Sequence, residues 1–222
     1  MDETEAAQAR EDLLNRIAAD MRETALWTGR EALSGPVIAA LRRVPRHLFV
    51  PENDRRHAYV NQPRPIGCGQ TISQPFIVAL MTEFLDLRGN DRVLEIGAGS
   101  GYQSAVLAEI AQSVHSIEVI PELAETARTR LAELGYGNVT VVDGDGFDGL
   151  PEEAPFSAII VTAAPEKVPE NLLAQLAAGG RMIIPVGPPH RTQVLKRFFR
   201  RDDSTVDSAN LLPVAFVPMV PA

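Results

Sequence analysis

A glycine-rich loop is the first segment of this sequence whose spacing could do chemistry. Gly97, Gly99 and Gly101 follow a short apolar run and stand just before a segment of helical character. Glycine in such a strand-to-helix turn lets the backbone turn tightly and approach a ligand, because no Cβ stands in the way. Dinucleotide sites carry G-x-G-x-x-G, but Tyr102 occupies the last position of that pattern here. The loop indicates a ligand site or, as the alternative, only a tight turn.

Acidic side chains stand where the next two expected strands end. Glu118 ends the strand expected over 113–119, and the turn 143–146, Asp-Gly-Asp-Gly, follows the next strand. A carboxylate such as Glu118 can accept hydrogen bonds from both hydroxyls of a ribose, each worth about 1.5–3 kcal/mol. The carboxyl ends of parallel strands share one edge of a sheet, where ligands bind. These features together favour a nucleotide-type pocket, and S-adenosylmethionine suits it because this cofactor has no pyrophosphate to seat on a helix.

The elements that would carry these residues alternate between strand and helix. Such alternation is typical of a parallel sheet covered on both faces. We expect strands over 92–96, 113–119, 138–142, 157–162 and 181–186, with helices at about 102–111, 121–134 and 169–177 between them. Further strands at about 193–200 and 212–220 lack a helix between them and predict an antiparallel edge. The fold class is therefore α/β, a doubly wound and mostly parallel sheet.

Two parts of the chain are expected to form one structural unit. Residues 1–75 hold N-terminal helices and a loop that pack on the main domain, and residues 76–222 form a Rossmann-like domain with C-terminal strands. Leu13, Ile17 and Met21 recur at helical spacing, which predicts a buried stripe on the first helix. Trp27 is expected to pack against the main domain.

The stretch 45–75 is rich in proline and glycine, yet too apolar for a disordered linker. A long ordered loop inside a compact domain is usually functional. Its last part, residues 65–75, reads Pro-Ile-Gly-Cys-Gly-Gln-Thr-Ile-Ser-Gln-Pro. Together with residues 44–50, it closely resembles the protein-L-isoaspartate O-methyltransferase family. The resemblance spans roughly residues 37–220 and includes the segments 93–102, 144–146, 158–165, 179–180, 185–187 and 216–218.

This resemblance implies methylation of the free α-carboxylate of L-isoaspartyl residues in damaged proteins and peptides. The cofactor would be S-adenosyl-L-methionine, and the methyl ester would start repair through a succinimide. Ser73 takes the place of the family's active-site serine, with Thr71 and Ile72 beside it over substrate and cofactor. The resemblance implies cofactor contacts for Gly97, Gly99, Gly101, Glu118, Asp145 and Gly146, and a peptide groove lined by Phe216, Val217 and Pro218. Cys68 departs from the family, where a longer polar residue is expected.

A carboxylate nucleophile explains why no His/Asp or Cys/His pair stands out in these motifs. An α-carboxylate is already ionised at pH 7, so its attack on a methyl group needs no general base. Alignment of the reacting atoms can supply about 7–11 kcal/mol. We expect the Ser73 hydroxyl to donate a hydrogen bond that holds the substrate carboxylate, with help from Thr71.

The composition of the chain limits its possible partners and its cellular compartment. The chain has 222 residues, with 29 acidic against 21 basic side chains and a net charge of −8, which disfavours nucleic acid as a partner. The N-terminus leads into no apolar signal segment, no apolar run reaches membrane-spanning length, and Cys68 is the only cysteine. We therefore expect a cytoplasmic monomer without a membrane partner. The histidines show no ligand spacing, so no metal site is predicted.

A group of arginines lies close to the proposed substrate loop. They are Arg42, Arg43, Arg46, Arg55, Arg56 and Arg64. They either steer an anionic substrate towards the site or form an ordinary solvated face, and the second interpretation is favoured.

Two other functions stay open at this point. One is a methyltransferase of the same fold that acts on normal aspartate in one particular peptide, for which only residues 1–36 could supply an extra recognition segment. The other is a catalytically silent module that binds S-adenosylmethionine. The intact Thr71-Ile72-Ser73 segment argues against this alternative. A nucleic-acid methyltransferase is a weaker alternative, because a net charge of −8 disfavours binding to a polyanion.

Overall fold

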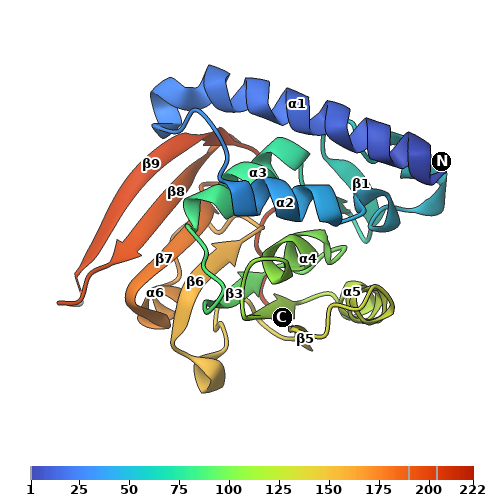
Figure 1. Cartoon of the computed structure of the whole chain (residues 1–222). Coiled ribbons are helices and arrows are strands. Elements are labelled where there is room, and N and C mark those ends of the chain that lie inside the picture. Colours follow the sequence, from blue (N-terminus) through green and yellow to red (C-terminus); the bar gives the residue numbers. More distant parts are fainter. Residues whose placement is uncertain (1, 190, 204) are drawn as a thin grey trace.

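The computed structural model describes residues 2–189, 191–203 and 205–222. Its centre is a seven-stranded sheet in the order β5-β4-β3-β6-β7-β8-β9 (Figure 1). The strands from β5 to β7 pair in parallel, and β8 and β9 extend the sheet as antiparallel strands. Their bounds are β3 (Arg92–Ile96), β4 (Ser113–Glu118), β5 (Val139–Asp143), β6 (Phe156–Val161), β7 (Leu176–Val186), β8 (Gln193–Arg200) and β9 (Val206–Val214). The predicted fold class is confirmed.

The central strands β3 and β6 are buried on both faces of the sheet, and they are apolar for that reason. Neighbouring side chains of a strand point to opposite faces, so Val93 joins one apolar cluster and Leu94 the other. Helices on the first face are α3 (Pro75–Phe84), α4 (Tyr102–Ala108) and α5 (Pro121–Glu133), while α6 (Glu170–Ala174) packs on the second. The parallel strands therefore end at one common edge, which is where a site can form.

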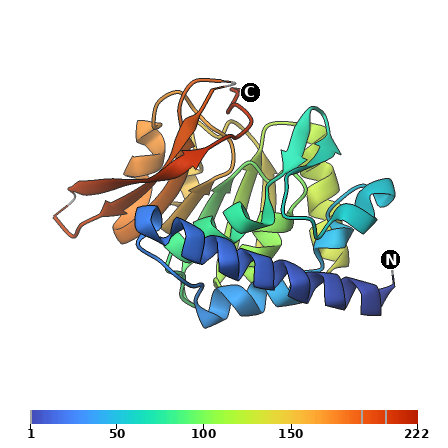
Figure 2. The ribbon, with the colours of Figure 1, turned by 90° about the horizontal axis from the view of Figure 1, so that it is seen from above.

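The N-terminal part lies over the first face. Helix α1 (Glu3–Thr28) contacts α2 (Gly35–Arg43), α3 and β9, and Figure 2 shows it crossing beside the antiparallel strands. Its buried residues include Leu13, Ile17 and Met21, as the helical spacing predicts. The prediction for Trp27 is wrong, because this side chain is 66% exposed near the end of α1. None of the helices in the described ranges is long and apolar enough to cross a membrane.

The proline-rich stretch contains more regular structure than its composition indicates. It forms two short 3-10 helices, η1 (Arg46–Leu48) and η2 (Glu52–His57), and a hairpin of β1 (Arg64–Gly67) and β2 (Gln70–Ile72). These elements are too short to give a periodic apolar pattern. Helix α3 follows directly, so the loop that carries Ser73 lies between a hairpin and a buried helix.

The last strand begins and ends earlier than expected. The sequence predicts it over 212–220, but β9 covers Val206–Val214. Its first five residues are exposed at the sheet edge, so they carry no buried apolar pattern. The chain after β9 instead returns to the main sheet: the Ala164 N–H donates to the carbonyl of Val217 at 2.8 Å, and the Met219 N–H donates to the carbonyl of Ala164 at 2.9 Å.

Candidate functional site

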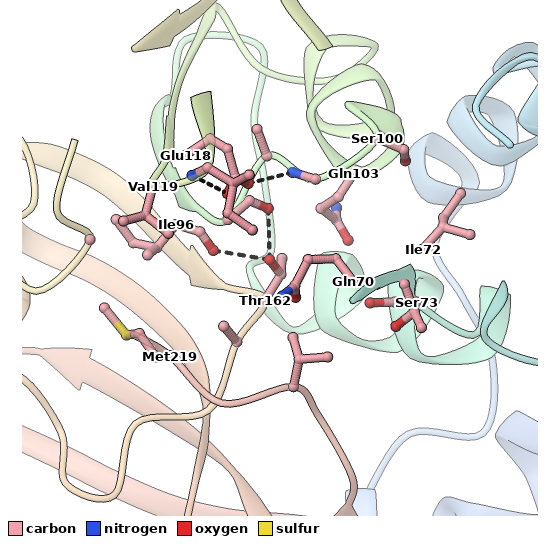
Figure 3. Close-up of a pocket in the computed structure, with 18 of the residues that line it drawn as sticks. Gln70, Ile72, Ser73, Ile96, Ser100, Gln103, Glu118, Val119, Thr162 and Met219 are labelled. Atoms are coloured by element: carbon pink, nitrogen blue, oxygen red, sulfur yellow. Dashed lines mark hydrogen bonds between the residues drawn. The ribbon is translucent and has the colours of Figure 1, made fainter. Parts of the chain in front are cut away.

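A pocket lies at the carboxyl ends of β3, β4 and β6 (Figure 3). One side is made by the glycine loop and the end of β4, and the other by β2 and the segment after it. The C-terminal segment completes the wall with Val217, Pro218, Met219 and Val220. Figure 3 shows Glu118 on one side of the pocket and Ser73 on the other. Segments that are far apart in the sequence thus meet at the sheet edge.

Two glycines of the loop form part of the pocket wall. Gly97 has φ +94°, and a Cβ at this position would clash with Oγ1 of Thr162. The Thr162 hydroxyl itself donates to the carbonyls of Ile96 and Gly97, at 3.0 and 2.7 Å. Gly99 also has a positive φ and lines the pocket. The backbone is therefore exposed to a ligand where a larger residue would close the space.

Glu118 holds the loop from the end of β4. Its carboxylate accepts the Gly99 N–H at 2.8 Å and the Ile120 N–H at 3.1 Å, and the residue is only 5% exposed. Each carboxylate oxygen keeps a further lone pair for a ligand. Glu118 can therefore shape the loop and accept hydrogen bonds from ribose hydroxyls at the same time.

Three other predicted residues differ in their relation to the pocket. Gly146 lines it, and a Cβ there would clash with the side chain of Ile96. Asp145 is not among the lining residues, and its oxygens accept the N–H groups of Phe147 and Ala222 at 2.8 and 3.1 Å. Gly101 stands behind the wall as the N-cap of α4, with φ +85°. Asp145 and Gly101 are thus placed to support the neighbouring backbone.

The lining residues fit S-adenosylmethionine better than a dinucleotide. None of the described residues that line the pocket is lysine or arginine, so no side chain among them would neutralise a pyrophosphate. The Glu118 carboxylate suits a ribose, and Ile96, Ile117 and Met219 offer apolar surface for an adenine ring. The exposed backbone of Gly97 and Gly99 leaves room for the methionine end.

The substrate loop is fixed from behind by a buried cation. Arg46 is fully buried; its Nε donates to the carbonyl of Ala58 and its Nη2 to the carbonyl of Ser73, both at 2.8 Å. Its guanidinium carbon lies 4.8 Å from the centre of the Tyr102 ring. Burial lowers the pKa of Arg46 to about 10, so it stays charged at neutral pH. The Ser73 hydroxyl has no hydrogen-bond partner among the described residues and is available to a ligand.

The arginines near the substrate loop differ in burial and in their ion pairs. Arg46 is not on a solvated face, so that interpretation is wrong for this residue. Arg42 and Arg43 are exposed and pair with Glu11 and Glu109 at 2.6 and 2.8 Å. Further ion pairs join Arg55 with Glu52 and Arg64 with Asp54. Because most of these charges are paired locally, they provide little net field for steering an anion.

A larger groove continues from the pocket. The two share Thr71, Ser73, Thr162 and Val217 as walls. The pocket encloses about 820 Å³ and the groove about 1940 Å³, counting space open to solvent. Phe216 lines the groove but not the pocket. The remaining walls come from α1, from residues 60–63, from Gln74, Phe76 and Ile77, from Thr192, and from residues 212–215. A small ligand and an extended chain could therefore meet at Ser73.

Several lining residues were not predicted as site residues. Thr162 belongs to a segment of the family resemblance, but only its position beside Gly97 reveals a role. Gln103 is buried and donates from Nε2 to Thr82 at 2.9 Å, which gives no signal in the sequence. Met219 reaches the pocket only because the chain turns back after β9.

Comparison with known proteins agrees with this arrangement. A family model described as protein-L-isoaspartate(D-aspartate) O-methyltransferase matches residues 24–222, so most of α1 precedes the match. A protein-L-isoaspartate O-methyltransferase 2 of Syntrophobacter fumaroxidans is 51% identical over 211 residues, which cover 95% of this chain and 85% of that protein. Another, of Polaromonas, is 50% identical over 93% of this chain and 98% of its own.

Solved structures show the same fold. A protein-L-isoaspartate O-methyltransferase has a TM-score of 0.76 and 28% identity, covering 92% of this chain and 65% of its own. A structure from Plasmodium falciparum, described as a complex with S-adenosyl-L-homocysteine, has a TM-score of 0.76 at 23% identity, covering 97% of this chain and 98% of its own. The chain belongs to the protein-L-isoaspartate(D-aspartate) O-methyltransferase family.

Proposed function

From this membership we propose that the chain methylates the free α-carboxylate of L-isoaspartyl residues in damaged proteins and peptides. The cofactor is S-adenosyl-L-methionine. The neighbouring backbone nitrogen of the substrate then attacks the methyl ester, methanol leaves, and the succinimide that forms starts repair. One observation carries the proposal: the cofactor-type pocket and the larger groove share Thr71 and Ser73 as walls. This is the arrangement required when a small methyl donor must meet a peptide carboxylate.

The cofactor is held by the sheet side of the pocket. When bound, S-adenosylmethionine supplies a methyl group activated by its sulfonium. Glu118 would accept hydrogen bonds from the ribose, and the exposed backbone of Gly97 and Gly99 would hold the methionine end. Gly146 leaves space for adenine, while Gly101 and Asp145 support this backbone from behind. Ile72 and Thr71 cover the cofactor from the opposite wall.

The substrate is held by the loop side. Ser73 donates a hydrogen bond to the substrate carboxylate, and Thr71 stands beside it in the same wall. Phe216 and Val217 line the path of the peptide. The carboxylate is ionised at neutral pH, so the residues orient it and exclude water rather than remove a proton.

We propose further that the chain acts as a cytoplasmic monomer on proteins and peptides rather than on nucleic acid or membranes. Arg16 is the single arginine among the described residues that line the groove. It is ion-paired with Asp20 at 3.3 Å, so this lining is poorly suited to a polyanion. The lone thiol of Cys68 is exposed and unpaired, which suits a reducing compartment.

A matched pair of peptides tests the activity. The two differ only in carrying isoaspartate or aspartate at one position, and each is offered with S-adenosylmethionine labelled in the methyl group. Label in a base-labile ester of the isoaspartyl peptide alone is the expected result. Label in the aspartyl peptide would instead support the peptide-modifying alternative. Label in neither, with cofactor binding intact by calorimetry, would support a silent binding module and overturn the proposal.

A further inference from the structure

We propose that one face of α1 recognises the residues that flank the isoaspartyl group. On this face, Glu23 favours substrates that carry a basic side chain near the damaged site. The inference rests on the proposed function, because it names the part of the substrate that the same site would accept.

The groove-facing residues of α1 form one stripe of the helix. Arg16, Asp20, Glu23 and Thr24 line the groove and follow the i, i+4, i+7, i+8 spacing of a single helix face. At 1.5 Å per residue the stripe is about 12 Å long. An extended peptide rises about 3.3 Å per residue, so the stripe spans about four peptide residues. Helix α1 can therefore contact a stretch of substrate and not only its methylated residue.

Among the described residues that line the groove, all charged side chains belong to this stripe. Arg16 pairs with Asp20 at 3.3 Å, and the Asn61 amide donates to the second Asp20 oxygen at 2.5 Å. Asp20 is thus already engaged and is only 14% exposed. Glu23 is exposed and has neither an ion pair nor a hydrogen bond within the described residues. Because the Arg16–Asp20 pair is neutral, Glu23 gives the groove its net negative charge.

Hydrogen bonds connect this stripe of α1 to the segment just after the loop that carries Ser73. Asn61 donates to Asp20 and also accepts the Phe76 N–H at 3.0 Å. Phe76 lies in the first turn of α3, just after the loop that carries Ser73. Helix α1 therefore has a defined position relative to Ser73, so that a charge on its face can act on a particular region of the bound peptide.

A series of isoaspartyl peptides tests this inference. Each peptide has isoaspartate at its centre and neutral residues elsewhere, except for one position within four residues on either side. That position carries lysine, glutamine or glutamate. At the position that faces Glu23, lysine is expected to give a KM about two- to tenfold lower than glutamate, since exposed ion pairs are weak. The difference should shrink in high salt.

Substitution of Glu23 should change this preference. Glu23→Gln is expected to abolish the difference between lysine and glutamate peptides, and Glu23→Lys to reverse it. Glu31→Lys is the matched control: Glu31 is exposed, lies outside both linings and undergoes the same charge change. This control should keep the lysine preference. Calorimetric binding of S-adenosylhomocysteine shows that each variant is folded.

The outcomes separate this inference from the proposed function. Equal KM values for all three peptides, or a lysine preference that survives Glu23→Gln, would overturn the role of Glu23 while leaving isoaspartyl methylation in place. A preference lost equally in Glu31→Lys would show an effect of total charge and also overturn it. Transfer to none of the isoaspartyl peptides would overturn the proposed function itself.

Discussion

The pocket and the groove share walls but are built in different ways. The pocket takes one side of its wall from the ends of β3, β4 and β6, which the parallel ladder holds in register. The groove takes its surface from α1, from the loop around Asn61 and from the segment 212–217. The cofactor, whose shape is constant, is thus bound at the rigid edge of the sheet. Peptides, whose sequences vary, contact the segments that surround this edge. Changes in the two regions should therefore have separable effects.

The largest effect is expected from Glu118→Ala. The substitution removes the proposed hydrogen bonds to two ribose hydroxyls, together worth about 3–6 kcal/mol. The dissociation constant for S-adenosylmethionine should rise by on the order of a hundredfold or more, as measured by calorimetry. The partly buried N–H groups of Gly99 and Ile120 also lose their acceptor, so the melting temperature should fall.

Glu118→Gln provides the control for this change. It retains one acceptor oxygen but loses the charge, so its affinity should lie between those of the Glu118→Ala variant and the unaltered chain. The KM for peptide at saturating cofactor should change little in either variant. An unaltered cofactor affinity in Glu118→Ala would remove this residue from the site.

Ser73→Ala should affect the substrate side of the site rather than cofactor binding. One hydrogen bond to the substrate carboxylate is lost, which predicts a 10- to 100-fold lower kcat/KM for methyl transfer. The dissociation constant for S-adenosylmethionine should stay close to that of the unaltered chain. Ser73→Thr is the companion variant, since it keeps a hydroxyl and should recover part of the rate. Unchanged turnover in Ser73→Ala, or a loss of cofactor affinity as large as for Glu118→Ala, would end the separation of the two regions.

A smaller effect concerns Glu95, which lies beneath the pocket. Its carboxyl is fully buried and accepts hydrogen bonds from Ser104 of α4 and Ser116 of β4. Burial raises the pKa of Glu95 from 4.5 to about 8. The folded state therefore binds a proton more tightly than the unfolded chain, so this group stabilises the fold most below pH 4.5. That contribution is lost progressively up to about pH 8.

Glu95→Gln makes this pH dependence measurable. A neutral amide keeps an acceptor for the two serines, so the variant should lose the fall in stability between pH 5 and pH 8. In the unaltered chain we expect a fall in melting temperature larger than that of the variant by roughly 10 °C over this interval. Parallel melting curves for the two proteins would contradict a buried, protonated Glu95.

Sequence reasoning was most successful for the sheet and least successful for the groove. The alternating pattern predicted the parallel strands, because buried strands are short apolar runs bounded by helices. It also placed Gly97, Gly99 and Glu118 at the sheet edge, where the structure brings them together. The substrate loop around Ser73 depended on family resemblance, since its residue types alone specify no reaction.

Other features depend on contacts that no local pattern reveals. The groove-facing stripe of α1 is visible only when the helix has been docked near Asn61. Arg46 resembles its surface neighbours in sequence, but it is buried behind Ser73. Trp27 was expected to pack against the main domain, yet burial is set by the position of α1 and leaves it exposed. Tertiary placement, rather than residue type, decides these cases.

The smallest effect is expected at the tip of the β1–β2 hairpin. Cys68 and Gly69 both have positive φ, +50° and +71°, as a type I′ hairpin turn requires. Such turns favour Asn-Gly, because asparagine tolerates this conformation better than cysteine does. Cys68→Asn should therefore raise the melting temperature by about 1–2 °C, corresponding to about 0.5 kcal/mol. Methyl transfer should be unchanged, because Cys68 is exposed and lies outside the linings of both pocket and groove. A large loss of transfer with unaltered cofactor affinity would instead extend the substrate side of the site to the hairpin tip.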